Sequence, residues 1–162
     1  MNYGEYIKEL RIKKGLYQKD LANALICSVQ AISKYESGTI DIGIEYLDAL
    51  CKTLKININD FYNQKDNSEL FEEDNSFSQE RFSKYIIYLR QNRGITQKEL
   101  GELIDVPYKK ISKWEIGVSL PTINELKALA DFYNREIREL YYASEDVDYS
   151  SVKFRKKRKT NQ

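Results

Sequence analysis

Apolar residues recur along the chain at the three- and four-residue spacing of helices that bury one face. The pattern predicts a first helix with Ile7 and Leu10 on its buried side, ended by Gly15. A short helix is expected from Gln18, and a third helix after Ser28. The apolar positions of the fourth and fifth expected helices are Ile44, Leu47, Leu50 and Leu54, then Ile58 and Phe61. These spacings predict an all-α fold.

The same pattern occurs twice in the chain. Residues 6–62 align with residues 85–141 without a gap at a constant offset of 79, and 19 of the 57 positions are identical. Two copies separated by a domain length predict two small domains rather than a solenoid array. In the second copy Gly94 and Gly117 are expected to end helices, and Thr96 and Thr122 are good N-caps. Tyr17, the counterpart of Thr96, is a poor N-cap.

The copies define four expected segments with different charge. A first domain (1–62) is neutral, an acidic linker (63–78) carries −4, a second domain (79–142) carries +2, and a C-terminal tail (143–162), acidic and then basic, carries +3. The whole chain has 26 basic and 25 acidic residues, so its net charge of +1 hides this asymmetry. A local basic excess is typical of nucleic-acid binding, which makes the second domain a candidate contact. The basic tail is either a phosphate-binding arm or a solubilising end.

Composition argues against an enzyme. The 162-residue chain has no histidine, and its two cysteines, Cys27 and Cys51, have neither CxxC nor zinc spacing. It also lacks a glycine-rich phosphate loop. We therefore expect no catalytic residue, metal, cofactor or small-molecule substrate. No apolar run reaches the roughly 20 residues that cross a bilayer, and the start of the chain is not a signal peptide. No membrane contact and a cytoplasmic location are expected.

Two short helices joined by a short turn within each copy are typical of a helix-turn-helix. The second copy contains Gly-x-Thr-Gln-Lys-Glu-Leu at 94–100 and Ile-Ser-Lys-Trp-Glu-x-Gly at 111–117. This motif resembles the Cro/C1-type (XRE family) helix-turn-helix of phage repressors, and the resemblance covers both copies. It implies two tandem five-helix, lambda-repressor-like domains that bind double-stranded DNA.

The resemblance also implies roles for individual positions. The face of the recognition helix that meets base edges corresponds to Tyr108, Lys109, Lys110 and Lys113 in the second copy and to Val29, Gln30, Ala31 and Lys34 in the first. Phosphate contacts are expected from Gln97, Lys98 and Arg93 and from Gln18, Lys19 and Lys14. The pairs Arg11–Glu36 and Arg90–Glu115 match the family's ion pairs, which are expected to support the recognition helix rather than contact DNA. The chemistry agrees, because lysine donates to guanine and glutamine pairs with adenine.

The first copy departs from the family pattern in the turn of the motif. The family usually has glycine there, where φ is positive, but these positions hold Ile26 and Asp105. Aspartate tolerates a positive φ and isoleucine does not, so the first copy either strains its turn or opens it differently. Its candidate recognition face also has only one lysine, which predicts the weaker contact with DNA.

The expected function is that of a sequence-specific transcriptional regulator, a repressor from a bacterium, phage or mobile element that excludes polymerase from an overlapping operator. The first copy is expected either to engage a second half-site or to hold a homodimer together. The alternative is a protein-binding adaptor that uses the same fold through its first domain. Such an adaptor would be an antitoxin or a phage-encoded inhibitor of host defence that also represses its own promoter.

Overall fold

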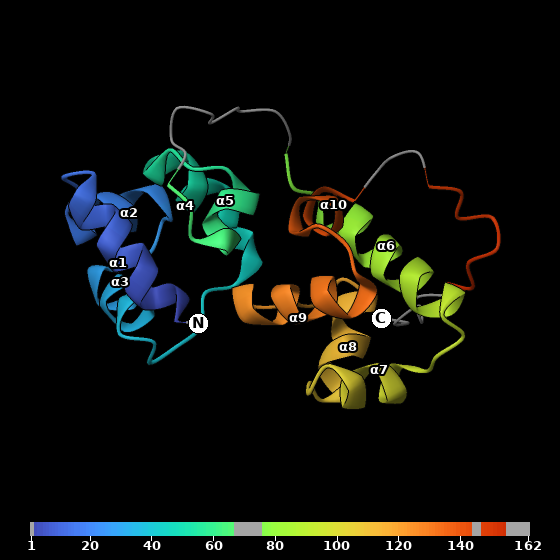
Figure 1. The fold of residues 1–162 in the computed structure, drawn as a ribbon. Helices are drawn as coiled ribbons and strands as arrows, with labels where there is room; N and C mark the ends of the chain where they lie inside the picture. Colours follow the sequence, from blue (N-terminus) through green and yellow to red (C-terminus); the bar gives the residue numbers. More distant parts are fainter. Residues whose placement is uncertain (1, 67–75, 144–146, 155–162) are drawn as a thin grey trace, which may run out of the picture.

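The computed structural model describes residues 2–66, 76–143 and 147–154 of the chain. All regular structure in these ranges is helical (Figure 1). The first half contains α1 (Tyr3–Lys13), α2 (Gln18–Ala24), α3 (Val29–Glu36), the 3-10 helix η1 (Ile44–Tyr46), α4 (Leu47–Leu54) and α5 (Ile58–Asn63). The second half contains α6 (Gln79–Asn92), α7 (Gln97–Leu103), α8 (Tyr108–Glu115), α9 (Ile123–Tyr133) and α10 (Ile137–Tyr142). The expected all-α fold of two tandem five-helix units is confirmed.

Two of the expected segments fall partly outside the described residues. The linker expected at 63–78 includes residues 67–75, and the tail expected at 143–162 includes 144–146 and 155–162. Across the described ranges, no helix is long and apolar enough to cross a membrane.

Each half buries the apolar faces that the spacing predicts. The buried residues include Ile7, Leu10, Leu21, Ile32, Leu47, Leu50, Leu54 and Phe61 in the first half and Phe82, Leu100, Ile111, Trp114, Leu126, Leu129 and Leu140 in the second. Cys51 is buried and Cys27 is half-buried, both are free, and burial raises the pKa of both thiols. The two cysteines therefore act as small apolar residues rather than as nucleophiles.

The ends of the helices follow the expected glycines and caps. Gly15 and Gly94, which follow α1 and α6, have φ values of +70° and +67°. Thr96 Oγ1 accepts from the Glu99 amide at 3.1 Å, and Glu99 accepts from the Thr96 amide at 2.7 Å, which forms a capping box at α7. Hydrogen bonds from the Thr96 backbone amide and side chain to the Glu99 carboxylate lower the pKa of Glu99 below its ordinary value. At α2 the Tyr17 side chain makes no cap bond, and only the reciprocal bond from the Tyr17 amide to Asp20 is present.

The start of the fourth helix differs between the halves. In the second half Thr122 and Glu125 form a capping box, so α9 begins directly at Ile123. The equivalent of Thr122 at the repeat offset is Gly43, which has no side chain to cap the helix. The first turn there is the 3-10 helix η1, and α4 begins only at Leu47. The single helix expected to carry Ile44 through Leu54 is therefore divided in two.

The turn between α2 and α3 is strained. Ile26 has a φ of +51° and its equivalent Asp105 a φ of +56°, so both turns adopt the left-handed conformation. A β-branched residue is unfavourable in this region. The sequence left open whether the first copy strains this turn or opens it differently. The structure shows that the turn keeps the left-handed conformation and is strained.

Replacing Ile26 by glycine is expected to raise the free energy of unfolding by about 1 kcal/mol, because glycine adopts this φ without the left-handed penalty. Ile26 is 93% exposed, so removal of its side chain loses little packing. Urea denaturation followed by circular dichroism measures the change. Asp105→Gly is the matched control and should gain less, since aspartate tolerates the left-handed region. A destabilised Ile26→Gly variant would contradict the assignment of strain.

Candidate nucleic-acid interface

Gly101 of α7 lies where this helix meets the segment that leads into α8. A Cβ on Gly101 would stand 2.4 Å from the carbonyl oxygen of Val106, a distance that real Cβ atoms do not show. The first half has Ala22 at the equivalent position and so accommodates a Cβ there. Gly101 was missed as a structural residue at the sequence level, although a glycine inside a helical pattern often marks a close approach.

The structure places the expected base-contacting residues of the second half on one exposed side of α8. Ile111, Trp114 and Glu115 are buried. The opposite side, which we call the α8 recognition face, consists of Tyr108, Lys109, Lys110 and Lys113, all exposed. Lys109 and Lys113 lie one helical turn apart and therefore project side by side.

Lys110 differs from the other two lysines of this face. Its Nζ lies 2.5 Å from Glu125 Oε1, and Glu125 also belongs to the capping box of α9. This contact holds Lys110 toward the start of α9. The principal cations of the α8 recognition face are therefore Lys109 and Lys113.

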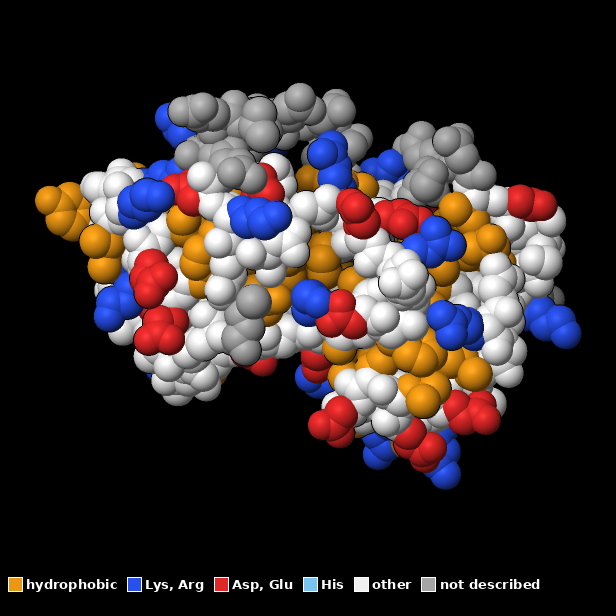
Figure 2. All heavy atoms as spheres, in the orientation of Figure 1, with side chains coloured by type: hydrophobic (Ala, Val, Ile, Leu, Met, Phe, Trp, Pro, Cys, Tyr) orange, Lys and Arg blue, Asp and Glu red, His pale blue; other side chains and the backbone are white. Residues whose placement is uncertain are grey.

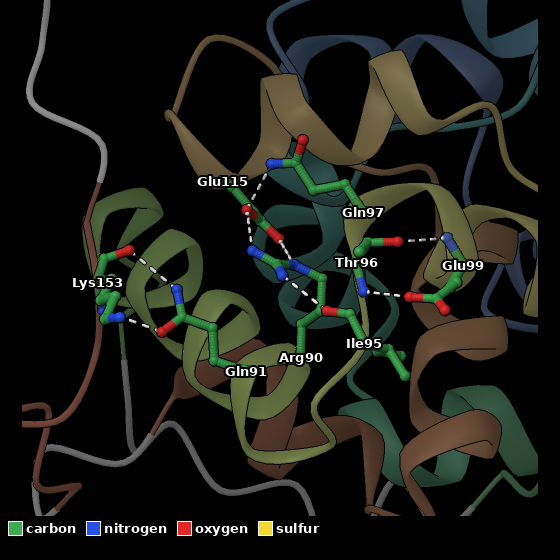
Figure 3. Close-up of polar contacts among 8 residues, drawn as sticks. All are labelled: Arg90, Gln91, Ile95, Thr96, Gln97, Glu99, Glu115 and Lys153. Atoms are coloured by element: carbon green, nitrogen blue, oxygen red, sulfur yellow. Dashed lines mark hydrogen bonds and ion pairs between the residues drawn. The ribbon is translucent and has the colours of Figure 1, made fainter.

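A buried ion pair holds α8 against the first helix of its domain (Figure 3). Arg90 of α6 donates through Nη2 to Glu115 Oε2 at 2.9 Å and through Nε to Glu115 Oε1. The third donor, Arg90 Nη1, reaches the carbonyl oxygen of Ile95 at 2.9 Å. Gln97, the first residue of α7, donates to Glu115 at 2.7 Å. The Glu115 carboxylate at the end of α8 thus joins this helix to α6 and to the start of α7. Its hydrogen bonds with Arg90 raise the pKa of that guanidinium further above its ordinary value.

The first half repeats this arrangement. Arg11 donates to both carboxylate oxygens of Glu36 at 2.6 and 3.0 Å, and to the carbonyl oxygen of Leu16 at 2.9 Å. Gln18 donates to Glu36 at 2.9 Å. We call each set of Arg, Glu and Gln a brace. The two braces give α3 and α8 the same orientation within their domains.

The face of α3 that corresponds to the α8 recognition face is less basic. Val29, Gln30 and Lys34 are exposed and Ala31 is half-buried. These four residues form the α3 recognition face. The start of α3 is capped by Ser28, whose hydroxyl accepts from the Ala31 amide at 3.1 Å, whereas no side chain caps the start of α8. Large apolar side chains are also exposed nearby, with Tyr17 at 74% and Ile26 at 93%.

The expected phosphate contacts divide into two groups. Lys19 and Lys98 are exposed. The Lys98 Nζ lies 3.8 Å from Glu102 Oε1, which is a weak ion pair. Gln18 and Gln97 each use one amide hydrogen in a brace. A side-chain amide carries two, so one hydrogen of each remains for a phosphate.

The second group of expected phosphate contacts is already engaged within the protein. The Lys14 side chain is 16% exposed and its Nζ lies 3.1 Å from Asp66 Oδ1. The Arg93 guanidinium stacks on the Phe132 ring, 5.1 Å from its centroid. Lys14 and Arg93 therefore have protein partners that a phosphate would have to replace.

The described part of the tail lies along α6. The Gln91 side chain donates to the Lys153 carbonyl and accepts from the Lys153 amide, both at 2.9 Å (Figure 3). The Tyr149 ring meets the Tyr88 ring edge to face at 5.9 Å. These contacts attach the segment that precedes the basic end of the chain to the second domain.

Charge on the face drawn in Figure 2 is mixed rather than concentrated. Figure 2 shows acidic and basic side chains interspersed on the visible face, including the lower right where α7 and α8 lie in Figure 1. The visible face of the molecule therefore has no broad basic patch. What distinguishes the exposed lysines of α8 is their position on the helix. In the described ranges no cluster of three or more histidine, cysteine, aspartate or glutamate residues has the arrangement of a metal site.

Comparison with known proteins yields a family and one curated relative. The family model described as Helix-turn-helix matches twice, at residues 7–61 and 86–140. The HTH-type transcriptional activator BcrR of Enterococcus faecalis is 31% identical over 74 residues, which cover 46% of this chain and 36% of the relative. The chain thus matches only about a third of that relative's length. No solved structure matches the chain significantly.

Proposed function

Because the chain belongs to the helix-turn-helix family, with two DNA-binding domains in tandem, we propose that it is a sequence-specific regulator of transcription that places α8 in the major groove of duplex DNA. The observation that carries this proposal is the α8 recognition face, where Lys109 and Lys113 project side by side from a helix whose other side is buried. The family is one of non-catalytic DNA-binding proteins, which agrees with the absence of histidine from the sequence.

Base contacts come from the exposed side of α8. Lysine donates to guanine O6 and N7, so Lys109 and Lys113 favour guanines in the major groove. Tyr108, 51% exposed at the first turn, adds an aromatic and a hydroxyl group to the same surface. The uncapped first turn of α8 leaves its amides without a side-chain acceptor, and helix N-termini favour phosphate oxygens.

Phosphate contacts fix the position of the domain on the duplex. Gln97 can donate one amide hydrogen to Glu115 and the other to a phosphate, so it links the brace to the DNA backbone. Lys98, next to it and 77% exposed at its side chain, supplies a cation at the same end of α7. Lys19 and Gln18 occupy the equivalent positions in the first domain.

Affinity for a duplex pool of random sequence is expected to fall steeply with salt. The logarithm of the binding constant should decrease by about 0.9 per phosphate neutralised for each decade of salt. Lys98→Ala is expected to reduce the slope by about one contact. Lys127→Ala is the control, because Lys127 on α9 already pairs with Asp131. Fluorescence anisotropy across a salt series measures both slopes, and a flat profile would contradict the proposal.

The mode of regulation that we propose is repression. Occlusion of polymerase at an overlapping operator needs only surfaces that bind DNA. The curated relative is named an activator, so the two modes have to be separated by experiment. A reporter whose promoter overlaps the bound site should lose expression when the chain is produced, and increased expression would reverse the assignment.

A protein-binding role for the first domain is the second candidate. It is favoured by the exposed apolar side chains of Tyr17, Ile26 and Val29 around α2 and α3. This candidate predicts that the recognition face of α3 contributes nothing to DNA affinity. Gln30→Ala with Lys34→Ala tests it, because unchanged affinity for a bound duplex would favour a protein partner and a lowered affinity would favour DNA.

A further inference from the structure

The two halves of the chain pack through contacts that are related by the repeat. The Ile44 amide donates to the carbonyl oxygen of Pro121 at 3.0 Å, and the Ile123 amide donates to the carbonyl oxygen of Ile42 at 2.8 Å. Ile123 and Pro121 are the equivalents of Ile44 and Ile42 at the offset of 79. The two hydrogen bonds are therefore the same contact made in both directions. They flank an antiparallel bridge between Gly43 and Thr122, which are themselves equivalent.

A second pair of reciprocal contacts lies deeper in the interface. The Tyr62 hydroxyl donates to the carbonyl oxygen of Ile123 at 3.1 Å, and the Tyr141 hydroxyl donates to the carbonyl oxygen of Ile44 at 3.2 Å. Tyr62 and Tyr141 are again equivalent and both are buried. They belong to α5 and α10, which lie side by side in the upper part of Figure 1.

These reciprocal contacts define a two-fold relation inside one chain. Exchanging the halves maps each contact onto its partner, as in the isologous interface of a symmetric dimer. The axis passes between Gly43 and Thr122. A two-fold axis places equivalent helices at the same height, so α3 and α8 lie on the same side of the molecule. In Figure 1 they occupy the lower left and lower right, away from the contact of α5 with α10.

The geometry points to a chain that binds, as a monomer, an inverted repeat of two unequal half-sites, an inference that rests on the proposed function. Half-sites in a duplex are related by a two-fold axis, so two recognition helices related by such an axis meet them in the same way. The interface that would join two chains is already formed within one. A single chain therefore supplies both recognition helices.

The two half-sites differ because the recognition faces differ. The α8 face presents Lys109 and Lys113, which favour guanine. The α3 face presents Gln30 and Val29, which favour adenine and the thymine methyl group. The operator is therefore an imperfect palindrome, guanine-rich under α8 and richer in adenine and thymine under α3.

The test uses the intact chain and duplexes enriched by it from a random pool. The enriched sequences should contain two inverted, unequal half-sites at one spacing, and the complex should contain one 19.1 kDa chain per duplex by sedimentation. Insertion of about five base pairs, half a helical turn, between the half-sites should lower the affinity to that of the α8 half-site alone. Two chains per duplex, a lone half-site, or an affinity unchanged by the insertion would overturn the inference. A pool without any enriched sequence would overturn the proposed function, and this inference with it.

A protein variant tests the interface directly. Tyr62→Phe with Tyr141→Phe removes both reciprocal hydroxyl contacts and keeps the rings. Affinity for the whole operator should fall by roughly tenfold, since two buried hydrogen bonds are lost, with no change for the isolated α8 half-site. Tyr85→Phe is the control, because its hydroxyl bonds Glu139 within the second domain. Equal losses on both duplexes, or no loss on either, would refute the role of the interface.

Discussion

Replacing Lys109 and Lys113 together by alanine is expected to lower the affinity for a selected duplex by roughly a hundredfold or more. A good contact between a side chain and a base contributes about 1–3 kcal/mol, and about 1.4 kcal/mol corresponds to a factor of ten in affinity. Both lysines are exposed, and Lys113 follows Lys109 by one turn of α8. Circular dichroism should show the same helix content as in the original chain, because neither side chain contributes to the core.

The control for this pair removes the same amount of charge elsewhere. Lys52 of α4 is exposed and Lys127 of α9 pairs with Asp131. The double variant Lys52→Ala with Lys127→Ala should retain the specific affinity within a small factor. If the control loses as much affinity as the α8 variant, net charge rather than the recognition helix governs binding. If the α8 variant keeps its affinity, the assignment of α8 as the recognition helix is wrong.

Replacing Glu115 by alanine is expected to lower the free energy of unfolding by about 3 kcal/mol, since removal of one partner leaves a charge buried without compensation. The side chains of Arg90 and Glu115 are only 13% and 5% exposed. Gln97 loses its acceptor in the same variant, so the contact between α7 and α8 also weakens. Urea denaturation measures the change.

Two further variants separate the ion pair from its surroundings. Arg90→Met with Glu115→Leu removes both charges and should recover much of the lost stability, because well-packed apolar residues can replace a buried pair. Glu102→Ala is the matched surface control. Glu102 is 66% exposed at its side chain and lies 3.8 Å from Lys98, so its removal should change stability by less than about 0.5 kcal/mol. A Glu115→Ala variant as stable as this control would show that the brace has no structural role.

Much of each domain was predictable because the signals are local. Helix periodicity identified the buried faces, and Gly15 and Gly94 marked helix ends where a positive φ is required. The difference between Thr96 and Tyr17 as caps is a property of single side chains, and the structure has it as expected. The division of the fourth helix was not predicted. Its cause is the lack of a cap at Gly43, although the apolar spacing of the two copies is the same in this region.

The partners of individual charges were less predictable than the positions of the charges. Lys110 and Lys14 fall on or beside the motif in the sequence, but their partners Glu125 and Asp66 lie outside it, 15 and 52 residues further along the chain. Arg93 likewise stacks on Phe132 of α9. A pattern of residue types indicates which helix face is polar, whereas the partner depends on how the helices pack.

The association of the two domains was not predictable from the pattern at all. Its reciprocal bonds join the backbone of Ile44 to that of Pro121 and the backbone of Ile123 to that of Ile42, and backbone groups leave no trace in residue types. Periodicity also shows that Tyr62 and Tyr141 belong to buried faces without showing what covers them. The sequence therefore predicts two domains joined by a linker, with the first copy either engaging a second half-site or holding a homodimer together.

Selection from a random pool of duplex DNA with the intact chain tests the central claim most directly. We expect enrichment of a defined sequence that contains a guanine-bearing half-site, bound at least roughly a thousandfold more tightly than a shuffled duplex of the same composition. Enrichment should disappear with the Lys109→Ala and Lys113→Ala variant and persist with the Lys52→Ala and Lys127→Ala control. A pool that remains random after repeated rounds, or equal affinity for selected and shuffled duplexes, would contradict the claim that this chain recognises DNA sequence through α8.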